Sequence, residues 1–296
     1  MAKIRSSKED IIFDIINYII LAVALIVTLY PLYFIVIASI SDPVAINNGK
    51  VWLRPVGVTF EGYRRIFKDE MIWTGYKNTI LYTLVGTAIN VMLTMMIAYP
   101  LSRKNFSGRR FLTIFLVITM YFNGGLIPTY IVVKNLGLVN NWWVMVLLGA
   151  VSTYNVIICR TFLQANIPEE LYEAAAIDGC SHFNFFIKHV LPLSKAIIAV
   201  LALYYGIAHW NEFMKGLIYL RDEKLYPLQL ILRAILIENQ ARDQMMDDVQ
   251  YTMEKQQVGE LIKYGIIIVA SLPVLIIYPF LQKYFVKGVM VGSIKG

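Results

Sequence analysis

The residues with the clearest capacity for chemistry gather in the outer half of one apolar stretch, residues 193–219. Tyr205, His209 and Glu212 stand at positions i, i+4 and i+7, so a helix places them on one face. Further aromatic and amide side chains flank this face: Tyr204, Trp210 and Asn211. Aromatic rings pack on the C–H faces of sugars, while amides and carboxylates bond to sugar hydroxyls. An ionisable group at membrane depth usually faces a water-filled cavity, so the pattern fits a carbohydrate path.

The same residues also fit a belt of side chains at a membrane surface. Trp210 and Tyr219 would then lie among the lipid headgroups, with Glu212 already in water. The two interpretations overlap, because one long helix can begin in a cavity and end at its rim. The sequence leaves both open.

Polar residues in two other apolar stretches are further candidates for such a path. Asn123 lies in residues 111–133 and is followed by two glycines, which can open a helix that lines a cavity. Tyr154 and Asn155 lie in residues 142–164. Each of these residues alone is more often a packing residue than a ligand.

Motifs typical of enzymes are missing from the sequence. It has no G-x-x-x-x-G-K-[ST] phosphate loop, so we do not expect this chain to hydrolyse ATP. It has neither H-E-x-x-H nor G-x-S-x-G. The three histidines lack metal-ligand spacing: His182, His189 and His209. The sequence therefore predicts no catalytic residue, no metal site and no cofactor bound by this chain.

An unusually apolar chain must position these residues. Of its 296 residues, 58% are hydrophobic and 16% charged, whereas soluble domains carry about 25% charged residues. This composition excludes a disordered chain, a nucleic-acid-binding tail protein and an ordinary cytosolic enzyme. The net charge of +7 then indicates Lys and Arg flanking membrane spans. Two cysteines, Cys159 in an apolar stretch and Cys180 in a polar loop, give no disulfide framework.

Six stretches reach the roughly 20 apolar residues that a helix needs to cross a bilayer. They are residues 16–40, 79–100, 111–133, 142–164, 193–219 and 261–282. Backbone groups in lipid must be paired internally, so the sequence predicts an all-α polytopic membrane protein with six transmembrane helices. Residues 1–15 form a cytoplasmic segment in this prediction, and residues 16–296 form a single domain.

The distribution of Lys and Arg predicts the orientation. The total count is nearly even on the two sides, but the rule applies to short loops near span ends. The short loop 102–110 is rich in cations: Arg103, Lys104, Arg109 and Arg110. We therefore expect both termini in the cytoplasm, extracellular loops at about 41–78 and 220–260, and a cytoplasmic loop at about 165–192.

This cytoplasmic loop begins with a short predicted helix. Pro168 suits the first helical position, and Glu169 and Glu170 favour the positive end of the helix dipole. Gly179 stands where a left-handed residue ends a helix. Ser181 can cap a second short helix, which a Leu-Pro pair at 191–192 is expected to end.

The charge of the first helix bears on its partner. It carries only acidic side chains: Glu169, Glu170, Glu173 and Asp178. A loop lying on anionic lipid headgroups is usually basic, so an acidic knob fits a protein partner with basic groups better. A loop on the membrane surface stays an open alternative.

Three pieces of this loop resemble the EAA motif of permease subunits of bacterial ABC importers. They are Glu173-Ala174-Ala175, Asp178-Gly179 and Leu191-Pro192. The resemblance extends to further segments: Trp52 to Phe67, Thr119–Tyr130, Trp210-Asn211-Glu212-Phe213, Tyr226–Arg233 and Tyr284–Gly296. The chain is most similar to the carbohydrate-uptake branch, and within it to the LplC- and YtcP-type permeases for oligosaccharides and polysaccharide fragments.

The resemblance implies a type I importer permease fold in the bacterial inner membrane. It further implies a heterodimer with a second permease subunit, a dimer of ATP-binding subunits that carries ATP and Mg, and an extracellular solute-binding protein. The first short helix would be a coupling helix that seats in the ATP-binding subunit. The residues implied to dock there are Glu173, Ala174, Ala175, Asp178, Gly179, Leu191 and Pro192.

Three positions depart from the family pattern. Cys180 replaces the usual alanine, His189 an isoleucine, and Ala196 a common proline. None of them removes Glu173 or Gly179.

The alternative function is an ion-coupled secondary transporter working without an ATPase, for which inverted repeats and several membrane carboxylates would be expected. The EAA-like loop favours the importer.

Overall fold

We describe the chain from a computed structural model, which defines residues 8–245, 259, 261–276 and 279. Every regular element within these residues is a helix, which confirms the predicted all-α class. The chain divides into two compact units: Met1–Asp69 with Ile235–Ser271, and Glu70–Ala234 with Leu272–Gly296.

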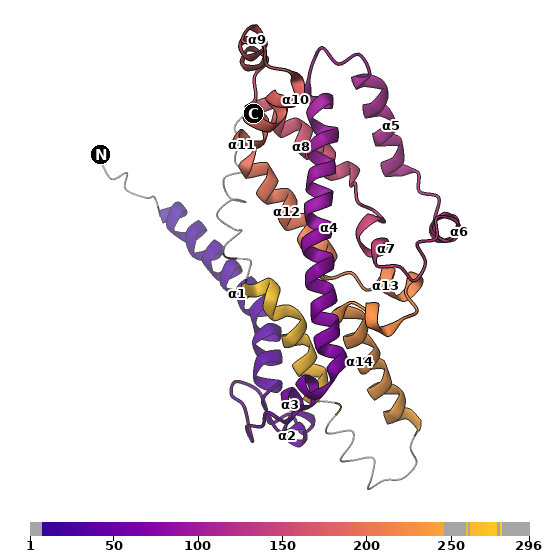
Figure 1. Cartoon of the computed structure of the whole chain (residues 1–296). Helices are drawn as coiled ribbons and strands as arrows, with labels where there is room; N and C mark the ends of the chain where they lie inside the picture. The colour runs from indigo at the N-terminus through magenta and orange to yellow at the C-terminus, as the bar shows by residue number, and fades with distance from the viewer. Residues whose placement is uncertain (1–7, 246–258, 260, 277–278, 280–296) are drawn as a thin grey trace. The chain divides into compact units, whose positions relative to one another are not determined.

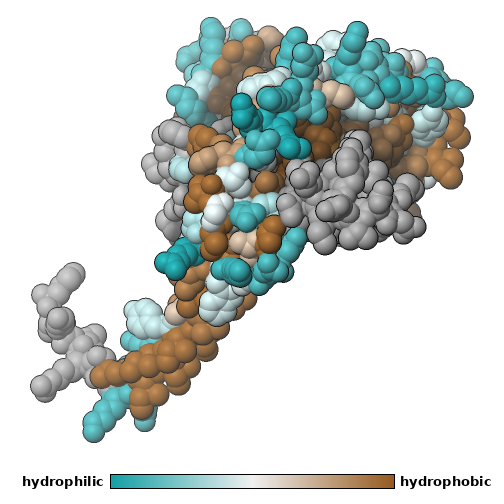
Figure 2. Space-filling view, turned by 90° about the horizontal axis from the view of Figure 1, so that it is seen from below, coloured by the Kyte–Doolittle hydropathy of each residue, from teal (hydrophilic) through white to brown (hydrophobic). Residues whose placement is uncertain are grey.

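The first unit begins with the long helix α1, Lys8–Ala38. Its large apolar side chains are exposed along most of its length, for example Phe13 at 65% and Leu21 at 64%. A helix of this length with such a surface can cross a membrane. Figure 2 shows hydrophobic residues, in brown, over large parts of the exposed surface. Such a surface fits contact with lipid or with partner helices.

The predicted loop 41–78 contains regular structure. Two short helices lie in it, α2 (Pro43–Asn47) and α3 (Glu61–Lys68). The Asp42 carboxylate accepts a hydrogen bond from the Val44 amide at 3.2 Å and so caps α2. The segment was predicted as a loop because it contains turn-forming and charged residues. Such residues can also begin short helices.

The long helix α4, Glu70–Ser102, runs through the second unit (Figure 1). It begins nine residues before the predicted span 79–100, because its first turns are stabilised by contacts far along the chain. The Asn78 amide donates to the carbonyls of Lys224 and Tyr226 at 2.8 and 3.0 Å. The Tyr82 hydroxyl donates to the Leu225 carbonyl at 2.8 Å. The apolar pattern that predicted the span cannot reveal such partners, because they lie far away in the sequence.

Asn140 also forms hydrogen bonds to the segment that contains Lys224 and Tyr226. Its backbone φ is 55°, a left-handed conformation that asparagine tolerates better than most residues. Its side-chain oxygen accepts hydrogen bonds from the amides of Arg221 and Asp222, each at 2.9 Å. Residues 220–228, at the start of the predicted extracellular loop 220–260, are therefore ordered by side chains of other elements.

Three predicted spans are interrupted rather than continuous. Residues 111–133 form α5 (Arg109–Tyr121) and α6 (Leu126–Asn135), which are bent by 116°. Residues 142–164 form α7 (Trp142–Leu147) and α8 (Thr153–Asn166). Residues 193–219 form α12 (Lys195–Trp210) and α13 (Met214–Tyr219).

Glycines explain two of these interruptions. Gly125, between α5 and α6, has φ +83°, and Gly149, between α7 and α8, has φ +76°. A right-handed helix cannot continue through such a residue. The Asn123 side chain also accepts a hydrogen bond from the Gly125 amide at 2.9 Å. The helix opening predicted at the two adjacent glycines after Asn123 is confirmed, whereas the break at Gly149 was not predicted.

The described helices give a smaller number of spans than predicted. Two of them, α1 and α4, are long and apolar enough to cross a membrane, and two bent pairs raise the number to four. A helix at Leu261–Ile276 covers most of the sixth stretch, 261–282, whose remainder lies largely outside the described residues. Helix α14, Leu228–Met245, occupies part of the predicted loop 220–260. The tail 284–296, which contributed to the resemblance, lies outside the described residues.

Candidate functional site

The predicted cytoplasmic loop forms a knob near the C-terminal end of α4 (Figure 1). Its first helix, α9, spans Glu169–Ile177. Pro168 is the N-cap rather than the first helical residue, a shift of one position that helix boundaries commonly show. Gly179 has φ +78°, which confirms the predicted left-handed residue. The Cys180 amide donates to the Ala175 carbonyl at 2.9 Å and closes the turn.

The second helix of the loop, α10 (His182–Phe185), is capped as predicted. The Ser181 hydroxyl accepts a hydrogen bond from the Asn184 amide at 3.3 Å. The expected end at Leu191-Pro192 is met to within one residue, because the helical run from His182 ends at Leu193. The chain continues through a π-helical turn, η1 (Phe186–Val190), and through α11 (Leu191–Leu193) before it bends by 79°. Pro192 is tolerated there because it lies in the first turn of α11.

The residues of the EAA-like motif divide between two environments. Ala175 and Leu191 pack against the buried cluster at this end of the unit. The remaining members have exposed positions: Glu173, Ala174, Asp178, Gly179 and Pro192. The structure therefore brings the motif to one surface knob, on which Glu173 and Asp178 are exposed while Ala175 and Leu191 anchor it.

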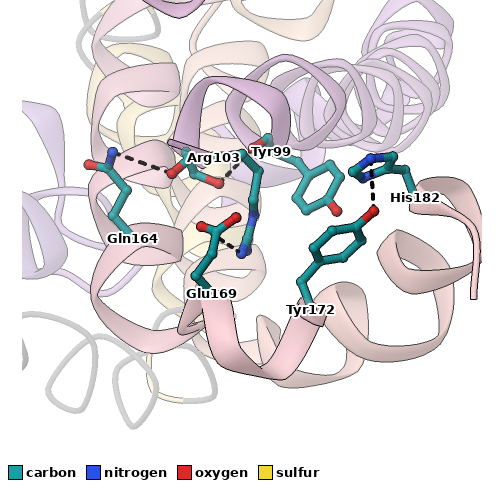
Figure 3. A network of polar contacts seen from close by, with 7 residues as sticks. Tyr99, Arg103, Gln164, Glu169, Tyr172 and His182 are labelled. Atoms are coloured by element: carbon teal, nitrogen blue, oxygen red, sulfur yellow. Dashed lines mark hydrogen bonds and ion pairs between the residues drawn. The ribbon is translucent and has the colours of Figure 1, made fainter. Parts of the chain in front are cut away.

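A network of polar and aromatic contacts joins this knob to α4 (Figure 3). Arg103, directly after α4, places Nη1 3.8 Å from Oε2 of Glu169, the first residue of α9. The Tyr172 hydroxyl lies 2.8 Å from Nε2 of His182, and the two rings stack with centroids 4.5 Å apart. This network was not predicted from the sequence, in which Arg103 indicated only the membrane orientation and Glu169 only the start of a helix.

On α12, Tyr205 and His209 face α4 and are buried, 4% and 6% exposed. The Tyr205 hydroxyl lies 2.8 Å from Oγ1 of Thr94 and accepts a hydrogen bond from the Ser152 amide at 3.1 Å. Nε2 of His209 lies 3.0 Å from the Asn90 side-chain nitrogen. These two candidate path residues therefore form hydrogen bonds that hold α12 against α4.

Glu212 does not continue the predicted helical face, because α12 ends at Trp210. Its carboxylate accepts a hydrogen bond from the Lys215 amide at 3.0 Å and pairs with Lys215 Nζ at 3.2 Å. Trp210 is 6% exposed, with its ring 6.3 Å from that of Tyr76. Asn211 is exposed and donates to the carbonyl of Ile207 at 3.0 Å.

The other candidates lie around the break between α5 and α6. Tyr154 is 54% exposed, and its ring centroid lies 6.5 Å from that of Tyr204 on α12. Oγ1 of Thr119 lies 3.3 Å from Oγ1 of Thr153, which places the end of α5 beside the start of α8. Asn123 is also exposed in this region, whereas Asn155 is only 5% exposed. Tyr154 and Tyr204 thus form an aromatic pair that is open at Tyr154 and half-buried at Tyr204.

A charged residue inside a predicted span was also missed. Arg160 lies in α8 and donates from Nη1 to Oγ1 of Thr113 at 3.3 Å. Counting charges within each span would have found it. In the described residues, no three His, Cys, Asp or Glu side chains are grouped so as to hold a metal ion.

Comparison with known proteins gives a consistent result. Residues 72–291 match the family described as the binding-protein-dependent transport system inner membrane component. Protein LplC of Bacillus subtilis is 36% identical over 292 residues, covering 99% of this chain and 98% of LplC. The polygalacturonan/rhamnogalacturonan transport system permease protein YtcP of the same organism is 37% identical over 285 residues, covering 96% and 99%.

A solved structure shares the fold. A chain from the crystal structure of a bacterial ABC transporter involved in the import of the acidic polysaccharide alginate superposes with a TM-score of 0.86 at 31% identity. The match covers 96% of this chain and all of the other. The chain therefore belongs to the family of binding-protein-dependent transport system inner membrane components: it is a carbohydrate ABC importer permease of type I fold, not an enzyme, and the ATPase is a separate subunit.

Proposed function

We propose that this chain forms half of the translocation path for an oligosaccharide or polysaccharide fragment and couples to its ATPase through the EAA-like loop. Its assembly would contain a second permease subunit, two ATP-binding subunits and an extracellular solute-binding protein. The substrates of two similar proteins support a polysaccharide-derived cargo: polygalacturonan and rhamnogalacturonan for YtcP, and alginate for the importer of known structure. The observation that carries the coupling role is the anchored knob with Glu173 exposed on α9.

The chemistry of the knob suits docking to a protein. An exposed carboxylate at Glu173 can form a charge-assisted pair with a basic group of the ATP-binding subunit. The neighbouring Ala174 is small and allows close approach of the partner. ATP binding would draw the two ATP-binding subunits together and move both coupling helices. The membrane helices would then open the path toward the binding protein, and hydrolysis would reset it.

We also propose six spans with both termini in the cytoplasm. Contacts along α4 support this arrangement. Its first turns contact residues 224–228, in a predicted extracellular loop. Its last residues adjoin Glu169, in the predicted cytoplasmic loop. Under this proposal the broken stretches 111–133 and 142–164 each count as one span, with their irregular backbone lining a cavity.

For the path itself, we propose that the exposed Tyr154 and the half-buried Tyr204, together with the exposed Asn123, form its wall. Rings offer apolar faces to a sugar, and the amide can bond to a hydroxyl. The hydrogen bonds of Tyr205 and His209 to α4 would hold α12 in place behind that wall. The remaining candidates would lie near the path without forming its wall: Trp210, Asn211, Glu212 and Asn155.

Affinity purification in mild detergent, with mass spectrometry of co-eluting chains, tests the proposal. Wild type is expected to recover an ATP-binding subunit and a second permease. Glu173→Ala should lower recovery of the ATP-binding subunit about tenfold, the range expected when a charged hydrogen bond is lost. Glu170→Ala is the matched control, since Glu170 is an exposed acid on the same helix. A stable lone protein, purified from membranes that contain all candidate partners, would contradict the proposed assembly.

A further inference from the structure

Arg103 stands where the longest helix of the second unit meets the cytoplasmic knob. Its guanidinium carbon lies 5.2 Å from the ring centre of Tyr99 in α4 and 5.9 Å from that of Phe185 in α10. Nη1 faces the carboxylate of Glu169 in α9. One side chain therefore contacts the membrane helix and both helices of the knob (Figure 3).

The two helices of the knob are joined to each other. Tyr172 of α9 stacks on His182 and packs edge-on against Phe185 of α10, with ring centroids 5.2 Å apart. The short contact between the Tyr172 hydroxyl and the His182 ring adds a hydrogen bond. A force applied to α9 is therefore shared with α10 before it reaches α4.

The link from Arg103 to the knob is incomplete in this conformation. The Arg103 side chain is only 7% exposed, and its Nε and Nη2 find no hydrogen-bond partner among the described residues. The separation of 3.8 Å from Glu169 is within reach of Coulomb attraction but too long for a hydrogen bond. A buried charge without full pairing raises the free energy of the state that contains it.

Space for a closer approach exists beside this pair. A cavity of about 260 Å³ is lined by Arg103, Glu169 and six neighbours. These neighbours are Tyr99, Pro100, Asn105, Phe106, Tyr172 and His182. A movement of α9 by about 1 Å toward α4 would bring the two charges to the length of a charge-assisted hydrogen bond.

We propose that Arg103 is the positioning residue that transmits the movement of α9 to α4, by tightening and releasing its pair with Glu169. The inference rests on the proposed coupling role of the knob and adds the contact through which that coupling enters the membrane helices. In this role Arg103 acts through Glu169, and its side chain is only 7% exposed. Glu173 docks the knob to the partner, whereas Glu169 links the knob to the permease.

The test uses the complete importer in proteoliposomes, with its binding protein and a sugar mixture that stimulates wild type. Glu169→Gln keeps the side-chain shape and removes its charge. It is expected to assemble with the ATP-binding subunit as wild type does, while stimulation of ATP hydrolysis by loaded binding protein falls about tenfold. Arg103→Lys should lose part of the stimulation, and the double variant should be no worse than Glu169→Gln, because both changes remove one contact. Glu170→Gln is the matched control and should behave as wild type.

The outcomes separate this inference from the proposed function. Stimulation in Glu169→Gln equal to that in Glu170→Gln would overturn the role of Arg103 while leaving the importer intact. Loss of assembly in Glu169→Gln would also overturn it, because Glu169 would then be a docking residue. Wild type that recruits no ATP-binding subunit would instead refute the proposed function itself.

Discussion

At the scale of single residues, one glycine in the second unit decides how closely α4 and α12 approach. Gly86 on α4 lies against the imidazole of His209 on α12, and a β-carbon at residue 86 would collide with that ring. His209 is held in place by its contact with Asn90. The absence of a side chain at residue 86 is thus a condition for the buried polar contact between α4 and α12.

Gly86→Ala is therefore expected to destabilise the protein. Overpacking of this kind costs about 1–3 kcal/mol, more than alanine gains over glycine in a helix. The melting temperature in detergent should fall by about 2–4 °C for each kcal/mol. Gly206→Ala is the control, because a β-carbon there meets only Oγ1 of Thr87, at an ordinary 3.8 Å. An equal melting temperature for Gly86→Ala and wild type would contradict the predicted collision.

Residue-level exposure also predicts which path residues meet water. Tyr154→Cys is expected to react with a water-soluble thiol reagent during transport, because Tyr154 is 54% exposed in its aromatic pair with Tyr204. Tyr205→Cys should react far more slowly, since residue 205 packs against α4. Cys180 would first be replaced by alanine, while Cys159 is buried. The reverse order of reactivity would place the path along the buried face of α12.

At the scale of elements, the turn after α9 sets the shape of the knob. Gly179 has a left-handed backbone but open space around its missing β-carbon. Gly179→Ala is expected to cost about 1–2 kcal/mol through backbone strain alone and to lower substrate-stimulated ATP hydrolysis. Gly179→Asn should recover part of the lost stability and of the lost ATP hydrolysis, because asparagine tolerates this conformation.

A second glycine gives the control for that prediction. Gly137 has φ +69° and equally open surroundings, but it lies in another loop. Gly137→Ala should lower the melting temperature as Gly179→Ala does and leave the stimulation of ATP hydrolysis unchanged. Equal stimulation in both variants would show that Gly179 serves folding only.

Residues close together in the sequence predicted the helices and their caps better than the positions where the helices begin and end. The all-α class, the Ser181 cap and the left-handed Gly179 depend on residues near in sequence, and all three are confirmed. The early start of α4 depends on Asn78 and residues more than a hundred positions away. The buried orientation of Tyr205 and His209 likewise depends on α4, so helical periodicity alone could not reveal which face turns inward.

At the scale of the whole molecule, the proposed topology predicts the sides on which two exposed residues lie. Asp222→Cys should be labelled by a membrane-impermeant maleimide added to intact cells. Lys104→Cys should be labelled only after the membrane is opened, because it lies in the cation-rich loop expected to face the cytoplasm. Both variants would carry Cys180→Ala. Labelling of Lys104→Cys in intact cells would invert the topology.

The hydrogen bonds that hold residues 220–228 also affect how a partner would be recognised there. Fixing a flexible backbone costs roughly 1–2 kcal/mol per residue, and association must normally supply that free energy. Asn78, Tyr82 and Asn140 have already fixed this segment within the chain. A protein that binds the charged side chains at 221–224 would therefore show a small entropy penalty in calorimetry, and its affinity would follow the identity of those four side chains.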